Sequence, residues 1–95
     1  MICIIYLIVF KKTRKVVYVG STNNLNYRIG QHKCRCNNVN SQGYYLPIYS
    51  YIRDNGGFNE YEFVTCGVYE NITKEQRYDY EQNEMNKYDD LLNCI

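Results

Sequence analysis

The apolar residues of this chain are grouped in strand-like segments at three places. Residues 2–10 are apolar on both alternating sets, and residues 16–20 are rich in β-branched and aromatic side chains, with a cationic stretch at 11–15 between them. This pattern predicts a β-hairpin whose first strand is central, because a strand buried on both faces has no polar alternation. Residues 61–69 have the same character and predict a third strand.

Three other segments place apolar residues at the three- and four-residue spacing of helices. In the first of them, Asn23 or Asn24 is a suitable cap for a helix that begins near Leu25. Arg28 and His32 are one helical turn apart in this segment, so we expect them to share a face of the helix.

Two further helices are predicted near Ile48 and towards the end of the chain. The first has Pro47 in its opening turn and two glycines at 56–57 after its last turn. The second begins with a capping box, in which Thr73 and Gln76 each bond the other's backbone N–H. The stripe expected to face the core on this last helix consists of Tyr78, Glu81, Met85, Tyr88 and Leu92.

Glu81 is a carboxylate within an otherwise apolar stripe. An ionised carboxylate that is buried without a partner costs several kcal/mol, so Glu81 needs a cation, a metal or a hydrogen-bond network. Two simpler explanations stay open at this point, an ion pair with Arg77 one turn earlier and exposure at the edge of the stripe.

These elements predict one α+β domain over residues 1–95, with a small, mainly antiparallel three-stranded sheet flanked by about three helices. The apolar start at residues 1–10 is shorter than the roughly 20 residues of a membrane-spanning helix. It also lacks the leading positive charge and the cleavage site of a signal peptide. We therefore expect an intracellular protein with no membrane partner.

The chain has five cysteines, which is an odd number for a disulfide framework, and we expect them to be reduced. His32, Cys34 and Cys36 suggest a zinc site. Their C-x-C spacing lacks the usual separation of two to four residues, however, and no second ligand pair is evident. Zinc is therefore not expected.

The formal net charge is only +1, but the charges are unevenly placed. Residues 1–53 contain eight Lys and Arg residues and no acid, whereas residues 54–95 contain three Lys and Arg residues and all ten acids. A basic half predicts a surface for a polyanion such as nucleic acid. Charges that fold back and neutralise each other are the plainer alternative.

Two short motifs and three single residues occur in a characteristic order. The motifs are Ile4-Ile5-Tyr6 and Tyr18-Val19-Gly20, and they are followed by Arg28, His32 and Glu81. With this order the chain resembles the GIY-YIG nuclease superfamily over nearly its whole length. The stretch NNVNSQGYYLPIYSYIRDNGGFNEYEF and the closing LLN are similar to small nuclease domains of giant DNA viruses and phage homing endonucleases, which suggests a viral origin.

The sequence departs from the motifs of this superfamily at two positions. Ile4 stands where the first motif has Gly, and Val19 stands where the second has Ile. The second change is conservative. The first changes the backbone options near Tyr6, because Gly often marks a close approach to a ligand.

The resemblance implies a metal-dependent endonuclease that hydrolyses phosphodiester bonds in duplex or branched DNA. Glu81 would hold one divalent cation, Mg²⁺ or Mn²⁺, and no small-molecule cofactor is implied. A transient homodimer stays open, because a one-metal site cuts one strand at a time. The residues assigned to the catalytic site are Tyr6, Tyr18, Arg28, His32, Glu81 and Asn93.

The resemblance also implies a role for each of these residues. Tyr18 is the first choice for the general base, with a proton relay through His32. Arg28 would stabilise the charge that develops on the phosphate. Tyr6 would hydrogen-bond the attacking water or the phosphate, and Asn93 would brace the site from the C-terminal end.

DNA is the partner that both the charge pattern and the resemblance favour. An alternative is a catalytically inactive nucleic-acid-binding module, and a third possibility is a protein-interaction domain with exposed tyrosines. The binding module does not explain a carboxylate in an apolar stripe. The cations expected on a DNA-facing surface around the site are Lys11, Lys12, Arg14, Lys15, Lys33 and Arg35.

The pairing of the first two strands decides whether the two motif tyrosines meet. If residue 10 pairs with residue 16 across a five-residue loop, Tyr18 lies opposite Ile8 and diagonal to Tyr6 on the same sheet face. A slip of one residue would place the tyrosines on opposite faces. With the first register, we expect both tyrosines to converge with Arg28, His32 and Glu81 on one concave surface.

Overall fold

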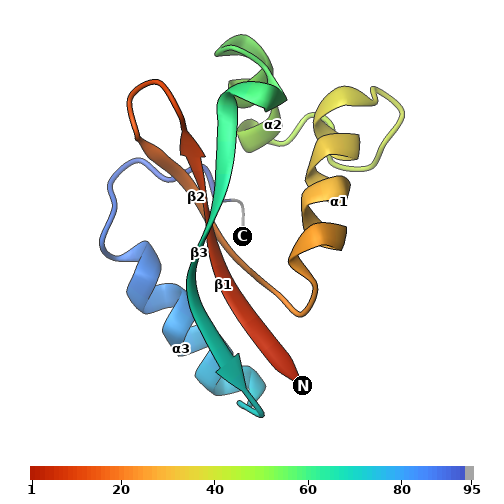
Figure 1. The fold of residues 1–95 in the computed structure, drawn as a ribbon. Coiled ribbons are helices and arrows are strands. Elements are labelled where there is room, and N and C mark those ends of the chain that lie inside the picture. The colour runs from red at the N-terminus through yellow and green to blue at the C-terminus, as the bar shows by residue number, and fades with distance from the viewer. Residues whose placement is uncertain (94–95) are drawn as a thin grey trace.

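The computed structural model describes residues 1–93, in which helices cover both faces of a three-stranded antiparallel sheet (Figure 1). The strands are β1 (Ile2–Phe10), β2 (Val16–Thr22) and β3 (Tyr61–Glu70), arranged in the order β2-β1-β3. A short 3-10 helix, η1 (Phe58–Glu60), leads into β3. The predicted fold class and the central position of β1 are confirmed, and β2 and β3 extend slightly beyond their predicted ends.

The hairpin of β1 and β2 has the predicted register in its middle but not at its turn. Ile8 lies opposite Tyr18, as predicted, whereas Val16 pairs with Val9 rather than with Phe10. A β-bulge beside Ile8 absorbs this one-residue difference, because a bulge sets two residues of one strand against one of the other. The two motif tyrosines therefore still share a face of the sheet.

Two helices, α1 (Leu25–Asn37) and α2 (Pro47–Asp54), cover the sheet face that carries the motif tyrosines (Figure 1). The side chain of Asn24 caps α1 by accepting a hydrogen bond from the backbone N–H of Tyr27, and Pro47 occupies the first position of α2. Both helix starts agree with the sequence. The buried residues of this layer are Tyr6, Ile8, Val17, Cys36, Ile48, Tyr49, Ile52 and Tyr61.

Helix α3 (Lys74–Met85) covers the opposite face of the sheet, where the other alternating set of β1 side chains is buried (Figure 1). The predicted capping box of Thr73 and Gln76 is present with both of its hydrogen bonds. None of the helices in residues 1–93 has the length and apolar character needed to cross a membrane. The buried residues of this second layer are Cys3, Ile5, Leu7, Val9 and Val19.

The last helix is shorter than its apolar pattern predicts. It ends at Met85, so Tyr88 and Leu92 lie beyond it, and Tyr78 at its other end is 66% exposed rather than packed on the sheet. After the helix the chain turns through Asp90, which has a φ of 59°, and returns to β2. A longer helix would carry residues 91–93 away from β2, so their contact with that strand requires the earlier end.

Candidate active site

A buried chain of hydroxyl and imidazole groups links β1 to α1 and α2. His32 is 1% exposed, its Nε2 lies 2.7 Å from Oη of Tyr6, and its Nδ1 lies 2.8 Å from Oη of Tyr49. Buried polar groups need such partners, and both ring nitrogens have one. Tyr49 could not be recognised from the sequence, because it stands on the apolar face of α2, where a core residue is expected.

His32 is neutral in the folded protein. Burial lowers the pKa of His32 to about 3, and the positive charges of Arg28 and Arg35 add to the effect. A neutral imidazole has one donor and one acceptor nitrogen. Because Nε of Arg28 donates to Tyr6 Oη at 3.3 Å, the Tyr6 hydroxyl hydrogen is left to point at Nε2 of His32. We therefore assign the His32 proton to Nδ1, where it is donated to Tyr49.

Tyr6 and Tyr18 lie side by side, with their ring centroids 6.2 Å apart. Tyr6 is fully buried, and burial together with the neighbouring Tyr18 raises its pKa well above the ordinary value, against a smaller opposing effect of Arg28. Tyr6 therefore keeps its proton and acts as a hydrogen-bond donor. Tyr18 is only half-buried, and its ring meets the edge of the His32 ring at a centroid distance of 5.4 Å.

Arg28 is held against the two tyrosines from α1. Its Nε donates to Tyr6, and its Nη1 donates to Oε1 of Gln31 at 2.6 Å. Burial by itself would lower the pKa of Arg28, but the phenol groups of Tyr6 and Tyr18 raise it further, so the net shift is upward. Arg28 is a permanent cation beside both motif tyrosines.

Gly20 of the second motif makes room for this arrangement. It lies directly opposite Tyr6 in the hairpin. A Cβ atom at position 20 would lie 2.5 Å from Cζ and Oη of Tyr6 and 2.8 Å from Cε1 of Tyr18. Contacts that short do not occur for real side chains, so only glycine allows the Tyr6 hydroxyl to sit there. At the first motif, Ile4 pairs regularly with Thr22 and replaces the family's glycine within a continuous strand.

Glu81 reaches the sheet from the α3 side, which is the face opposite the tyrosines. Its Oε2 accepts a hydrogen bond of 2.6 Å from Oγ of Ser21, the residue that follows Gly20 on β2. Glu81 is half-buried, and the ion pairs found in residues 1–93 do not include one between Glu81 and Arg77. Ser21 was not identified from the sequence, because its role depends on how α3 packs against β2.

A groove of about 670 Å³ joins the two faces at this end of the sheet. Its lining includes Arg28 on the tyrosine side and Ser21, which holds Glu81, on the α3 side. Because β2 is an edge strand, groups from both faces reach the groove around it. The structure therefore gathers Tyr6, Tyr18, Arg28 and His32 on one face of the sheet. The expectation that Glu81 shares this surface is not met, because α3 packs on the opposite face, and Glu81 reaches the groove only through its hydrogen bond to Ser21.

Asn93 braces β2 next to the second motif. Its side-chain amide donates to the carbonyl of Val19 at 2.6 Å and accepts from the N–H of Val19 at 3.1 Å. These bonds satisfy the backbone of the residue between Tyr18 and Gly20 on an otherwise open strand edge. The expected position at the edge of the site is observed, and the contacts are to the protein backbone.

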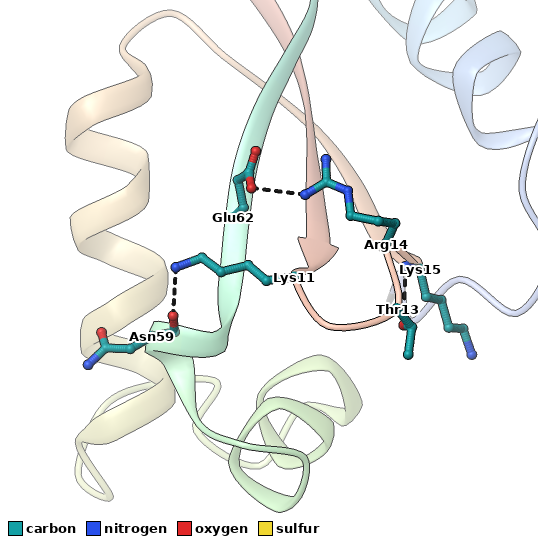
Figure 2. A network of polar contacts seen from close by, with 6 residues as sticks. All are labelled: Lys11, Thr13, Arg14, Lys15, Asn59 and Glu62. Carbon is teal, nitrogen blue, oxygen red and sulfur yellow. Dashed lines mark hydrogen bonds and ion pairs between the residues drawn. The ribbon is translucent and has the colours of Figure 1, made fainter.

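The cations of the hairpin turn lie at the other end of the sheet from the groove. Arg14 pairs with Glu62 at 3.0 Å, and Nζ of Lys11 donates to the carbonyl of Asn59 at 2.9 Å; both contacts are drawn in Figure 2. Lys15 lies 5.9 Å from the ring centroid of Tyr51. The structure therefore does not place the hairpin cations around the site as expected, because they are turned towards β3, η1 and α2. A contact of Lys12, Lys33 or Arg35 with DNA stays a prediction.

The zinc alternative has no support in the geometry of His32, since both of its ring nitrogens are bonded to tyrosines. Cys3, Cys34, Cys36 and Cys66 are free thiols, and Cys94 lies outside the described residues. Within residues 1–93 there is no group of three His, Cys, Asp or Glu side chains placed to hold a metal.

A single carboxylate suits a different kind of cation. Mg²⁺ is commonly held by one or two carboxylates, with water and the phosphate oxygens of the substrate completing its shell. Ser21 engages only Oε2 of Glu81, so the same carboxylate can also bind a cation through its other oxygen. The donor set at the groove therefore fits a hard divalent cation that binds together with a phosphate.

The chain matches the GIY-YIG catalytic domain over residues 2–93. It therefore belongs to the GIY-YIG nuclease family, and the resemblance seen in its motifs is confirmed. Nucleases of this family generally use divalent metal ions. Comparisons with curated proteins and with solved structures gave no match.

Proposed function

We propose that this protein is a DNA endonuclease that hydrolyses phosphodiester bonds in duplex or branched DNA with a divalent cation, Mg²⁺ or Mn²⁺. The observation that carries the proposal is the meeting of Tyr6, Tyr18 and Arg28 at one end of the sheet, although they come from two strands and a helix. These residues stand in the sequence motifs that resemble those of the family, and the groove lined by Arg28 offers room for a DNA strand.

Arg28 would stabilise the negative charge that develops on the phosphate. Its hydrogen bonds to Tyr6 and Gln31 use Nε and Nη1, which leaves Nη2 to donate to a phosphate oxygen. A planar guanidinium suits this task because it presents several donors in a fixed geometry. The hydrogen bond from Nε to Tyr6 fixes the orientation of the guanidinium group.

Tyr18, in its ionised phenolate form, which the neighbouring cation and Arg28 would favour, would accept a proton from the attacking water. Tyr18 is the less buried of the two motif tyrosines, whereas the high pKa and full burial of Tyr6 keep its proton in place. As the water oxygen bonds to phosphorus, the bond from phosphorus to the 3′ oxygen breaks, and the departing 3′ oxygen takes a proton from solvent, which leaves a 5′-phosphate and a 3′-hydroxyl. The relay through His32 is not part of this proposal, because both of its nitrogens are already bonded, and His32 positions Tyr6 instead.

Glu81 would hold the divalent cation, together with water and the phosphate oxygens of the DNA. The cation would supply Lewis-acid stabilisation of the departing 3′ oxygen. Ser21 orients the carboxylate by donating to Oε2, as outer hydrogen-bond partners commonly do for metal ligands. Removing the negative charge of Glu81 should therefore remove cleavage without removing the fold.

Incubation with supercoiled plasmid tests this function. The parent protein should convert the plasmid to nicked or linear forms in Mg²⁺ or Mn²⁺ and leave it intact in EDTA. Glu81→Gln should abolish cleavage, whereas Asp79→Asn, an equivalent change at an exposed position of the same helix, should not. A Glu81→Gln protein that still cuts would remove Glu81 from the site. Salt-dependent DNA binding without cleavage by the parent would favour the inactive binding module.

A further inference from the structure

The groove carries cations that the proposed reaction does not use. Lys74 and Arg77 line it from α3, opposite Arg28 on α1. No acidic residue is among the lining residues, and the ion pairs found in residues 1–93 include neither Lys74 nor Arg77. Three cations and no acid among the lining residues make the potential of the lining positive, with Glu81 as the nearby carboxylate that Ser21 holds.

The position of these cations relates them to the proposed cut. Arg28 and Ser21 line the groove too, and they contact the two halves of the proposed site through Tyr6 and Glu81. A DNA strand whose phosphate lies against Arg28 must continue past the edge of β2. Each strand carries a phosphate every 3.4 Å or so along the helix axis, so the next phosphates come within the length of the groove.

We propose that Lys74 and Arg77 bind the phosphates next to the scissile one on the DNA strand that is cut. This inference rests on the proposed function, and it assigns the strand a path through the groove between α1 and α3. The hairpin turn is a poorer candidate for this contact, because Lys11 and Arg14 there already bond to Asn59 and Glu62 (Figure 2). The two α3 cations come from the acidic half of the sequence, which the charge pattern had not singled out.

Two double variants that each remove two positive charges test the path. Lys74→Gln with Arg77→Gln changes the groove, and Lys11→Gln with Arg14→Gln changes two exposed cations of the hairpin turn, which lies away from the groove. Binding to a labelled 20-base-pair duplex is measured by fluorescence anisotropy in EDTA over a range of salt concentrations. Cleavage of the same duplex is measured in Mg²⁺, and circular dichroism checks that each variant is folded.

The groove variant should raise Kd and KM about tenfold and leave kcat within about twofold, because the lost contacts are to phosphates that do not react. Its plot of log Kd against log salt should be shallower by about 1 to 2, since each phosphate contact contributes about 0.9 to the slope. The control variant should change Kd by less than about twofold. Lys74→Arg with Arg77→Lys, which keeps both charges, should bind nearly as well as the parent.

The proposal is overturned if the groove variant binds like the parent, or if the control variant weakens binding by the same factor. A fall in kcat with unchanged KM would also overturn it, because that result would assign the two residues to the chemical step. If the parent does not cut DNA but the groove variant alone loses affinity, the nuclease function fails and the groove assignment stands. If the parent cuts DNA and the groove variant binds unchanged, the groove assignment fails and the nuclease function stands.

Discussion

At the scale of single residues, the site depends on the absence of a side chain at Gly20. The hydroxyl of Tyr6 occupies the volume that any side chain at position 20 would need, and Tyr6 is in turn bonded to His32 and Arg28. This explains in physical terms why a glycine follows the second motif's tyrosine by two residues. Close packing at that point ties the hairpin register to the position of the Tyr6 hydroxyl.

Gly20→Ala should displace Tyr6 and break its bond to His32. We expect a loss of about 1 to 3 kcal/mol in the free energy of unfolding, as is usual for overpacking, and a loss of cleavage. Urea unfolding and the plasmid assay measure the two effects. Gly30→Ala is the matched control, because no atom lies within 4 Å of its new Cβ. That change, in the interior of α1, should raise stability by up to about 1 kcal/mol. A Gly20→Ala protein with parental stability and activity would contradict the account.

The burial of His32 predicts how stability depends on pH. The pKa of His32 is lowered to about 3 in the folded protein from an ordinary value of 6.5, so the unfolded chain binds the proton first. The stability that the protein gains from a neutral His32 is therefore complete above about pH 6.5. It decreases by about 1.4 kcal/mol per pH unit as the pH drops towards 3, so that roughly 2 kcal/mol is lost at pH 5.

Urea unfolding between pH 7.5 and pH 5 measures this slope. His32 is the only histidine in the chain, so few other side chains titrate in that window. The variant His32→Gln should be less stable at pH 7.5 but should lack the slope. Equal slopes in the parent and the variant would show that His32 is not held neutral.

The sequence identifies some of the site residues but not their partners. Tyr6, Tyr18 and Arg28 are recognised because they occur in ordered motifs close to predictable elements. Ser21 and Tyr49 are not, since a hydroxyl gains its role only from the group that tertiary packing places beside it. The same limit applies to the neutral state of His32, which depends on burial between elements that are distant in sequence.

At the scale of elements, the strands and helix starts follow from local signals, and the ends do not. The capping box at Thr73 and the proline at position 47 act within one turn of the chain, so their helices begin where the sequence predicts. The end of α3 at Met85 and the bulge beside Ile8 are set by contacts with β2. An apolar pattern cannot reveal them, because Leu92 is apolar whether it packs from a helix or from an irregular segment that returns to β2.

Asn93 should stabilise the open edge of β2. Asn93→Ala removes two hydrogen bonds to Val19, which should lower the free energy of unfolding by about 1 to 2 kcal/mol and speed hydrogen exchange of the Val19 amide. Asn83→Ala, at an exposed position of α3, is the control and should change neither quantity. Unchanged exchange at Val19 in Asn93→Ala would show that the C-terminal segment does not hold this edge.

At the scale of the whole molecule, the division of charge along the sequence does not become two separate surfaces. Arg14 of the basic half pairs with Glu62 of the acidic half, which is the neutralising arrangement that the charge pattern had left open. The positive side chains that line the groove come instead from both halves, Arg28 from one and Lys74 and Arg77 from the other. Charge counts along a sequence cannot anticipate which cations folding will pair.

The central claim is that the two faces of the sheet contribute to one site at the edge of β2, with the cation held by Glu81. Paramagnetic broadening of NMR signals by small amounts of Mn²⁺ tests it most directly, because the effect falls off steeply with distance from the ion. The account predicts selective broadening of the Gly20 and Ser21 amides and of the Arg28 side chain, and no such broadening in Glu81→Gln. Broadening centred on the exposed Asp89 and Asp90 instead, and unchanged by Glu81→Gln, would contradict it.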